Sequence, residues 1–244
     1  MRICQAFLVV IDISGYTRFI TRRTLSLQHA EQIISDLIGV VVDESRHPLI
    51  LNKLEGDAAL MYAEIEADSA QSRADLMAQV RSFFPAFRQR VLELSKMRDN
   101  CSCDACTNIT ALGLKAFVHC GEILLKQFRQ FEELAGEPVI LLHRLMKNSV
   151  QGSEYVLMSD AAMRFSGLDD SRLQSHVEHI EGMGTHQLWV ASAYNLPEWV
   201  GPESASAAIG VEPVQTRVFR NLPADDGATL PEGWVSRLWR RLRR

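Results

Sequence analysis

The chain opens with an apolar run from Ala6 to Ile11 that ends at a polar turn beginning with Asp12. A run of this length before a glycine-containing turn is typical of a strand buried on both faces. From about residue 18 to residue 43 the apolar positions follow helical spacing and fall on one helix face: Ile33, Leu37, Val40 and Val41. The pattern therefore predicts a central strand followed by an amphipathic helix.

Two hairpins and a long helix are predicted next. Residues 49–53 and 58–63 have strand character and meet at Glu55-Gly56-Asp57, a hairpin signal. Residues 69–96 predict the longest helix, with a kink at Pro85. Residues 112–118 and 122–126 predict a second hairpin, with Gly121 at its turn.

Shorter elements follow. Gly136–Val150 is predicted to be a helix with proline in its first turn, and residues 155–158 a short strand whose neighbour Ser159 caps another helix. A last hairpin is expected around Glu181-Gly182-Met183-Gly184. The order of these elements predicts an α+β fold with a mainly antiparallel sheet and helices packed on one face.

The same pattern divides the chain into a domain over residues 1–194 and a tail over residues 195–244. Periodicity fades in the tail, where Pro, Gly, Ala and Ser become frequent, and the chain ends in a basic segment, Arg237–Arg244. This end can be a solvated terminus, can contact a partner, or can lie weakly on an anionic membrane surface.

Composition narrows the class of protein. The 244 residues carry a net charge of −4, which argues against the strongly basic surface of a nucleic-acid-binding protein. No apolar run reaches the roughly 18–20 residues that span a bilayer. Five cysteines without an export signal fit a reducing compartment, so we expect a cytoplasmic protein.

Two carboxylates stand where the pattern predicts rigid backbone. Asp12 follows the central strand, and Asp57 follows Gly56 at a hairpin tip. Carboxylates held at strand ends can bind hard cations such as Mg²⁺ or Mn²⁺, and those cations can neutralise a triphosphate. Gly-Asp pairs are also common in ordinary turns, so this spacing alone leaves both interpretations open.

Five segments, in order, resemble motifs of the class III adenylyl and guanylyl cyclases: Phe7–Phe19, Lys53–Ala58, Leu114–Glu122, Gly136–Leu145 and Glu181–Gly184. The resemblance covers roughly residues 4–192. It is strongest with an uncharacterised bacterial branch of this superfamily that has the same Cys-x-Cys-x-x-Cys loop and His-Arg-Leu helix. The resemblance implies the ferredoxin-like class III nucleotidyl cyclase fold.

It also implies an activity: formation of a 3′,5′-cyclic nucleotide from a nucleoside triphosphate, with two divalent metals, at a homodimer interface. By the same resemblance, each motif residue has an expected role. Asp12 and Asp57 would bind the metals, the backbone of Ile13, Ser14, Gly15 and Tyr16 would hold phosphate, Lys53 and Glu133 would contact the base, and Arg144 would be catalytic.

The chain departs from the family pattern at two positions. Ile140 stands where the family has an asparagine that orients the ribose, and an isoleucine side chain forms no hydrogen bond. Glu181 stands in the turn where the family has a phosphate-binding lysine. These changes favour an alternative hypothesis, a catalytically silent cyclase-fold module that binds nucleotide or a partner and senses metal or redox state.

The sensing part of that hypothesis rests on a cysteine loop, Cys101, Cys103 and Cys106. Three thiols within six residues can bind zinc or an iron–sulfur cluster if a fourth ligand joins them. Cys120, His119, Cys4 or a residue of a second subunit could be that ligand. The alternative is a loop of unligated or redox-active thiols. His119 and His143 are predicted to be hydrogen-bonded core residues rather than catalytic ones.

Overall fold

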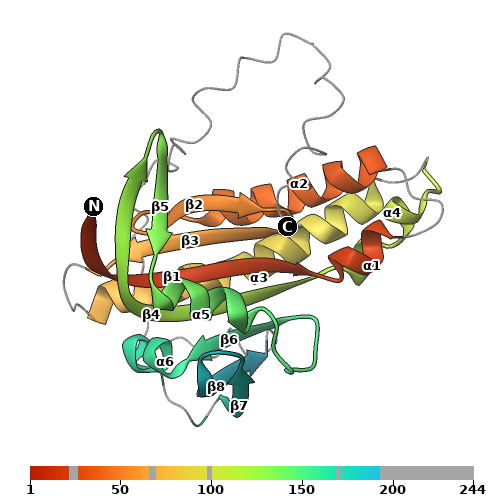
Figure 1. Ribbon diagram of the computed structural model, residues 1–244. Helices are drawn as coiled ribbons and strands as arrows, with labels where there is room; N and C mark the ends of the chain where they lie inside the picture. Colours follow the sequence, from red (N-terminus) through yellow and green to blue (C-terminus); the bar gives the residue numbers. More distant parts are fainter. Residues whose placement is uncertain (22–26, 66–69, 98–100, 169–170, 172, 193–244) are drawn as a thin grey trace. The chain divides into compact units, whose positions relative to one another are not determined.

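The computed structural model describes residues 1–21, 27–65, 70–97, 101–168, 171 and 173–192 (Figure 1). Its central strand is β1 (Arg2–Ser14), as the apolar run predicts. Successive side chains of β1 enter two different cores: Phe7, Val9 and Ile11 pack on one face of the sheet, and Ala6, Leu8 and Val10 on the other. Both faces of β1 are therefore covered, which explains why its apolar run does not alternate with polar residues.

The described strands form one eight-stranded sheet, in which β5 pairs with β4 beside the path β2-β3-β1-β4-β6-β8-β7. Their bounds are β2 (Ile50–Glu55), β3 (Ala58–Glu64), β4 (Gly113–Phe128), β5 (Phe131–Ala135), β6 (Tyr155–Ser159), β7 (Gln174–Ile180) and β8 (Gly184–Ser192). Among the paired strands of the described residues, β4 and β6 run parallel and all the other pairs are antiparallel. The predicted α+β class with a mainly antiparallel sheet is confirmed.

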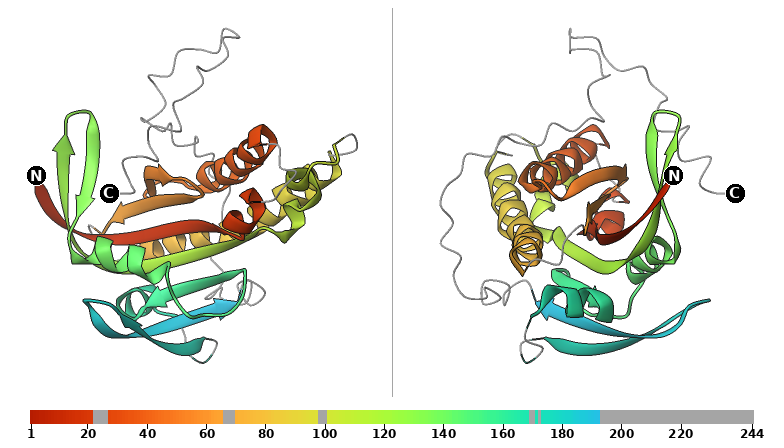
Figure 2. Two further views of the ribbon diagram at one scale, coloured as in Figure 1. Left: turned by 45° about the vertical axis from the view of Figure 1, so that its right-hand side comes forward. Right: turned by 90° about the vertical axis from the view of Figure 1, so that its left-hand side faces the viewer.

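Helices cover the two faces unequally (Figure 2). One face carries α1 (Tyr16–Ile20), α2 (Leu27–Glu44), α3 (Ala70–Lys96), α4 (Asp104–Thr107), the short 3₁₀ helix η1 (Ile109–Ala111) and α6 (Asp160–Ser166). The other face carries α5 (Glu137–Leu145), whose Leu141, Leu142 and Leu145 are buried against β1 and β4. Packing on one face thus holds for the long helices, while α5 lies opposite them, on the face where Asp12 also projects.

The second predicted hairpin is wrong. β4 continues as one strand through Gly121 to Phe128, and the turn comes only before β5. Gly121 is needed for packing instead, because a Cβ there would lie 2.6 Å from Pro138 Cγ. Glycine therefore allows the first turn of α5 to approach β4 closely, and the sequence pattern mistakes this close approach for a turn.

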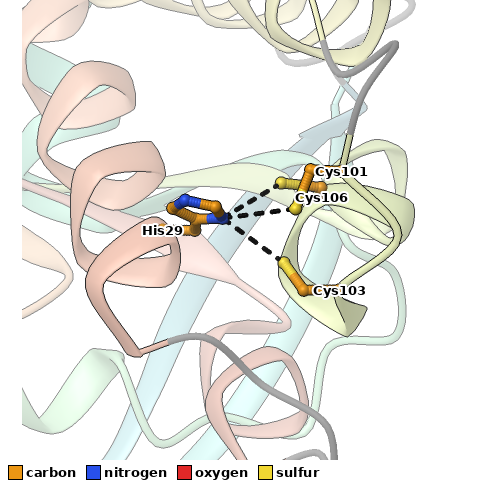
Figure 3. Close-up of side chains that lie close together, drawn as sticks. All are labelled: His29, Cys101, Cys103 and Cys106. Carbon is orange, nitrogen blue, oxygen red and sulfur yellow. Dashed lines mark hydrogen bonds between the residues drawn. The ribbon is translucent and has the colours of Figure 1, made fainter.

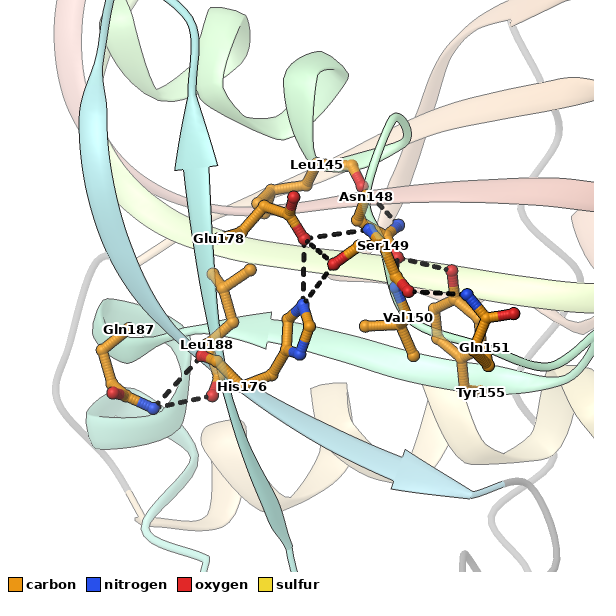
Figure 4. Close-up of polar contacts among 10 residues, drawn as sticks. All are labelled: Leu145, Asn148, Ser149, Val150, Gln151, Tyr155, His176, Glu178, Gln187 and Leu188. Carbon is orange, nitrogen blue, oxygen red and sulfur yellow. Dashed lines mark hydrogen bonds and ion pairs between the residues drawn. The ribbon is translucent and has the colours of Figure 1, made fainter.

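Helix α5 also ends five residues earlier than predicted, at Leu145. The Asn148 amide donates a hydrogen bond to the Leu145 carbonyl (2.7 Å), which ends the helix. The following loop is fixed to β7, where the Glu178 carboxylate accepts hydrogen bonds from the Ser149 backbone N–H and hydroxyl at 2.9 and 2.8 Å (Figure 4). His176 contacts the same Glu178 oxygen at 2.9 Å.

The helix predicted from about residue 18 to residue 43 is instead two helices, α1 and α2, because α1 ends at Ile20. Other predictions are confirmed or lie outside the described residues. The β2–β3 and β7–β8 hairpins, the strand β6 and the Ser159 cap of α6 are confirmed; the Ser159 hydroxyl accepts a hydrogen bond from the Ala162 N–H. α3 continues through Pro85. The tail of residues 195–244, with its basic end, lies outside the described residues. Within the described ranges, no helix combines the length and the apolar character needed to cross a membrane.

Candidate metal and nucleotide site

The structure brings Asp12 and Asp57 to the same end of neighbouring strands. Asp12 pairs with Ala58 across the antiparallel β1–β3 ladder, and Asp57 immediately precedes Ala58 in the β2–β3 turn. Gly56 permits this turn because it adopts a positive φ of 70°. The Ile13 N–H donates a hydrogen bond to the Asp57 carbonyl (3.0 Å), so the turn is fixed to the end of β1.

Burial and proximity destabilise the charges of this pair. Burial, followed by repulsion from Asp12, raises the pKa of Asp57 to about 6. Burial also raises the pKa of Asp12, and attraction to the Lys115 ammonium opposes that shift. Among the described residues, no basic side chain forms an ion pair with either carboxylate. A divalent cation would relieve both effects, and carboxylate oxygens suit hard cations such as Mg²⁺ and Mn²⁺.

The expected phosphate-binding backbone forms the bend between β1 and α1. Gly15 has a φ of 88°, in the left-handed region, and leads the chain from β1 into α1. Its carbonyl accepts the first helical hydrogen bond, from the Phe19 N–H at 3.0 Å. Burial, Glu31 and Asp57, in that order, raise the pKa of Tyr16. The charge of Asp57 is thus one of the two carboxylate charges that disfavour ionisation of the Tyr16 hydroxyl.

Lys53, expected to contact the base, forms an ion pair within its own strand. Its ammonium lies 2.6 Å from a Glu55 carboxylate oxygen, and the other oxygen lies 3.0 Å from His143 Nε2. His143 Nδ1 lies 2.8 Å from the Val139 carbonyl. Because both ring nitrogens face acceptors, the imidazolium is favoured: the hydrogen bond to Glu55 raises the pKa of His143, and the same bond lowers the pKa of Glu55 to about 2.

His143 is therefore not the core histidine that the sequence predicts. It is a half-buried ion-pair partner that links α5 to the end of β2, two residues before Asp57. His119 does match the prediction: it is buried, its Nδ1 lies 2.7 Å from the Ser159 hydroxyl, and burial, with a smaller contribution from His186, lowers its pKa to about 4.

The other base-contacting candidate, Glu133, lies on β5 opposite Lys126. Its neighbour Glu132 is the residue that faces β2 and β3: it accepts a hydrogen bond from the Tyr62 hydroxyl through its side chain and from the Asn52 amide (3.0 Å) through its carbonyl. Side chains alternate along a strand, so Glu133 projects to the opposite face of β5 from Glu132. No described contact joins Lys53 to Glu133, and the role of Glu133 stays a prediction.

Arg144 lies half-exposed near the end of α5, next to His143. Its guanidinium is 3.9 Å from the carboxylate of Glu181, so the end of α5 and the β7–β8 turn come together. Ile140 is 56% exposed on the same helix. Asn148 does not replace the missing ribose contact, because its side chain is hydrogen-bonded to Leu145, Val150 and Tyr155.

The cysteine loop has a fourth partner that sequence reasoning missed. His29 of α2 points its Nδ1 at the sulfurs of Cys101, Cys103 and Cys106 (Figure 3). The expected fourth ligands lie elsewhere: His119 bonds Ser159, Cys120 is shielded enough that burial raises its pKa to about 12, and Cys4 pairs with Ile123. An isolated histidine 72 residues before the first cysteine gives no local signal, so only the tertiary fold reveals it.

A cavity of about 670 Å³ lies beside the loop that follows α5. Arg88 of α3, the loop residues 149–154 and His176 of β7 contribute to its walls. None of the sequence-predicted site residues lines it. The carboxylate pair and the cysteine cluster are therefore separate from this cavity.

Comparison with solved structures identifies the fold. The guanylyl cyclase Cya2 superimposes with a TM-score of 0.62 at 14% identity, over 78% of this chain and 92% of that one. The adenylyl cyclase CyaB from P. aeruginosa superimposes with a TM-score of 0.59 at 14% identity, over 83% of this chain and 97% of that one. At this identity the likeness shows a class III cyclase fold and nothing about activity.

Sequence comparison identifies the family. An uncharacterized protein of Mycobacterium tuberculosis, Rv2561/Rv2562, is 32% identical over 166 residues, which cover 66% of this chain and 74% of that protein. Residues 34–155, half of the chain, match the family described as "Protein of unknown function (DUF2652)". The matched segment runs from α2 through Asp57, the cysteine loop and α5 to the start of β6. Because the family model matches half of the chain, this chain belongs to the DUF2652 family.

Proposed function

We propose that this protein is a nucleotidyl cyclase that binds a nucleoside triphosphate with two Mg²⁺ or Mn²⁺ ions at Asp12 and Asp57. The observation that carries the proposal is the half-buried carboxylate pair at the end of β1, where burial and Asp12 raise the pKa of Asp57 to about 6. Two half-buried carboxylates that repel each other lower the stability of the metal-free protein. A divalent cation bound to them removes this repulsion and therefore stabilises the protein.

The reaction would be attack of the substrate 3′-hydroxyl on the α-phosphate, with pyrophosphate as the leaving group. Divalent ions bound at the carboxylates would make the hydroxyl more acidic and neutralise the phosphate charge. The bend at Ser14, Gly15 and Tyr16 would position the phosphates, and Arg144 would stabilise the charge that develops on them. Lys53 and Glu133 would contact the base.

A homodimer is part of this proposal. Large apolar side chains are exposed along the domain: Leu54 on β2 and Ile140 on α5, and Phe128 and Phe131 at the tip of the β4–β5 hairpin, beyond the end of β1 opposite to Asp12. A second subunit that covered them would enclose the nucleotide between two copies of the chain. We also propose a cytoplasmic location, where nucleoside triphosphates are present and cysteines stay reduced.

A second candidate function has its own support. The Glu181 carboxylate lies 3.9 Å from Arg144, so it competes with a triphosphate for that guanidinium. Ile140 presents an apolar surface where the resemblance expects a ribose contact. These two positions favour a module that binds a nucleotide or a partner without turnover, and that responds to metal or redox state through the cysteine cluster.

One experiment separates the two functions. The purified full-length chain is incubated with each of the four nucleoside triphosphates and Mn²⁺, beside Asp57→Ala, and cyclic product is quantified by mass spectrometry. Product that disappears in the variant supports the cyclase and names the base. Nucleotide binding by calorimetry without product supports the silent module, and absence of both contradicts the cyclase and leaves a module that binds a partner and responds through the cysteine cluster.

A further inference from the structure

The contacts in the His29 cluster have the geometry of a metal site. His29 Nδ1 lies 3.4 Å from the sulfur of Cys101, 3.6 Å from that of Cys103 and 3.8 Å from that of Cys106 (Figure 3). A ring nitrogen carries at most one hydrogen, so it cannot donate to three sulfurs at once. Convergence of three cysteine sulfurs and one imidazole nitrogen on one point is explained better by a cation between them.

The distances suit zinc. Zinc bonds of about 2.0–2.1 Å to nitrogen and about 2.3 Å to sulfur, arranged tetrahedrally, place nitrogen and sulfur about 3.5–3.6 Å apart. The three observed separations bracket this value, and all four ligand atoms lie within 4.8 Å of one another. A [4Fe–4S] cluster would hold each ligand on a different iron and would spread the ligand atoms more widely. The geometry therefore favours a single ion over a cluster.

We propose that His29, Cys101, Cys103 and Cys106 bind one structural Zn²⁺ ion, and that this ion braces the bend at Gly15. Three thiolates and one imidazole complete a tetrahedral shell without an open position, which is the pattern of structural rather than catalytic zinc. The site is distinct from the carboxylate pair, whose oxygen ligands suit hard cations instead.

The bracing follows from the packing of the cysteine segment. After Cys106 the chain enters η1, and the carbonyl of Ala111 lies only 3.3 Å from where a Cβ of Gly15 would be. Ala105 and Ile109 of the same segment are buried in the core that also contains Phe19 of α1. Zinc would link α2 to this segment and so restrict the motion of the backbone at Ala111, which packs against the Gly15 bend.

Metal content tests the site directly. We expect the full-length protein, expressed with added zinc, to contain about one zinc per chain by mass spectrometry, and His29→Ala and Cys103→Ser to lose most of it. Cys4→Ser is the matched control, because Cys4 lies on β1 outside the cluster and should leave zinc content unchanged. Equal zinc content in His29→Ala and the wild type would overturn the assignment of His29.

Cobalt substitution keeps the test independent of whether the variants fold. Wild-type protein stripped of metal and loaded with Co²⁺ should show the intense visible bands of tetrahedral cobalt with thiolate ligands. Absence of these bands, together with absence of zinc in the native protein, would overturn the site. Neither readout involves a nucleotide, so its failure is distinct from failure of the proposed cyclase function.

Hydrogen exchange tests the bracing. Removal of zinc by a chelator should speed amide exchange in residues 27–35 and 101–112 and also in residues 15–20, while the β7–β8 hairpin remains unchanged. Faster exchange in the first two segments with unchanged exchange in residues 15–20 would refute the bracing. Restored protection after zinc is added back would show that the change is reversible and not caused by unfolding.

Discussion

The backbone N–H of Ile13 donates a hydrogen bond to the carbonyl of Asp57 at 3.0 Å. This bond joins the residue after one aspartate to the other aspartate, so the main-chain positions from which the two carboxylates project are fixed relative to each other. A fixed backbone favours cation binding, because little reorganisation of the site is needed when the cation binds. The bond therefore explains how the β2–β3 turn can hold the backbone of Asp57 in a fixed position next to β1.

Asp57→Asn is expected to stabilise the metal-free protein and to abolish its response to Mn²⁺. The folded-state pKa of Asp57 is raised to about 6, from an ordinary value of 3.8, so its contribution to stability is present below pH 3.8 and is lost as pH rises through 6. At pH 7.5 the neutral amide should add on the order of 1 kcal/mol to the free energy of unfolding. Thermal unfolding with and without Mn²⁺ measures both effects.

Asp43→Asn is the control for this experiment, because Asp43 is an exposed carboxylate of α2, the helix on the opposite face of the sheet. It should change neither metal-free stability nor the Mn²⁺ response. The wild-type Mn²⁺ response should also weaken as pH falls below 6, since a proton then competes with the ion. A Mn²⁺-induced rise in melting temperature that is equal in Asp57→Asn and the wild type would remove the metal assignment.

How far the sequence predicts this fold depends on whether each signal is local. The buried run of β1 and the glycine turn before Asp57 depend on neighbouring residues, so their pattern places them correctly. Gly121 is misleading as a turn signal, because glycine is needed at this position to make room for Pro138 and not to form a turn. β5, whose sequence FEELA contains two acids, has weak strand character of its own and forms by pairing with β4.

The residues of the candidate site also divide into those with a local sequence signal and those without one. The two aspartates and Arg144 stand in segments that a motif can identify, and the fold brings the two aspartates to the same end of neighbouring strands. His29 and the Glu55–His143 pair join residues 72 or more positions apart, so no local pattern connects them. Contacts between residues so far apart in sequence form only when the chain packs. The local pattern around His143 therefore predicts a core histidine and does not reveal its partner Glu55.

Replacing Glu181 with lysine should strengthen triphosphate binding. The Glu181 carboxylate faces Arg144 at 3.9 Å and is 95% exposed, so Glu181→Lys removes a competing charge and adds an attractive one without disturbing the core. Exposed charge pairs contribute modestly, so we expect about a three- to tenfold gain in affinity, measured by calorimetry. Asp43→Lys changes the charge equally on the opposite face and should have no effect; an equal gain in that variant would mean that only net charge matters.

The Glu55–His143 ion pair should stabilise the protein over a defined pH range. The lowered pKa of Glu55 gives stability that is present above 4.5 and is lost as pH falls through about 2. The raised pKa of His143 gives stability that is present below 6.5 and is lost as pH rises through its folded-state value. The pair therefore contributes fully between about pH 4.5 and 6.5.

His143→Gln tests this range when its free energy of unfolding is compared with the wild type from pH 4 to pH 9. Both side chains are about 30% exposed, so the largest difference should be about 0.5–1 kcal/mol. It should shrink at the alkaline end of the series. A difference that stays constant through pH 9 would show that His143 acts by packing and not by charge.

Two glycine-to-alanine substitutions should change stability in opposite directions. At Gly113, the first residue of β4, a Cβ would lie 2.5 Å from the Ser153 carbonyl oxygen and 3.0 Å from Glu154 Cγ. Because the nearest atom is backbone, the sheet must shift, and Gly113→Ala should cost about 1–3 kcal/mol. At Gly39, inside α2, a Cβ meets no atom within 4 Å, so Gly39→Ala should gain about 0.5–1 kcal/mol from helix propensity. Urea unfolding at constant m-value measures both, and a Gly113→Ala protein as stable as the wild type would contradict the close approach of β4 to the loop before β6.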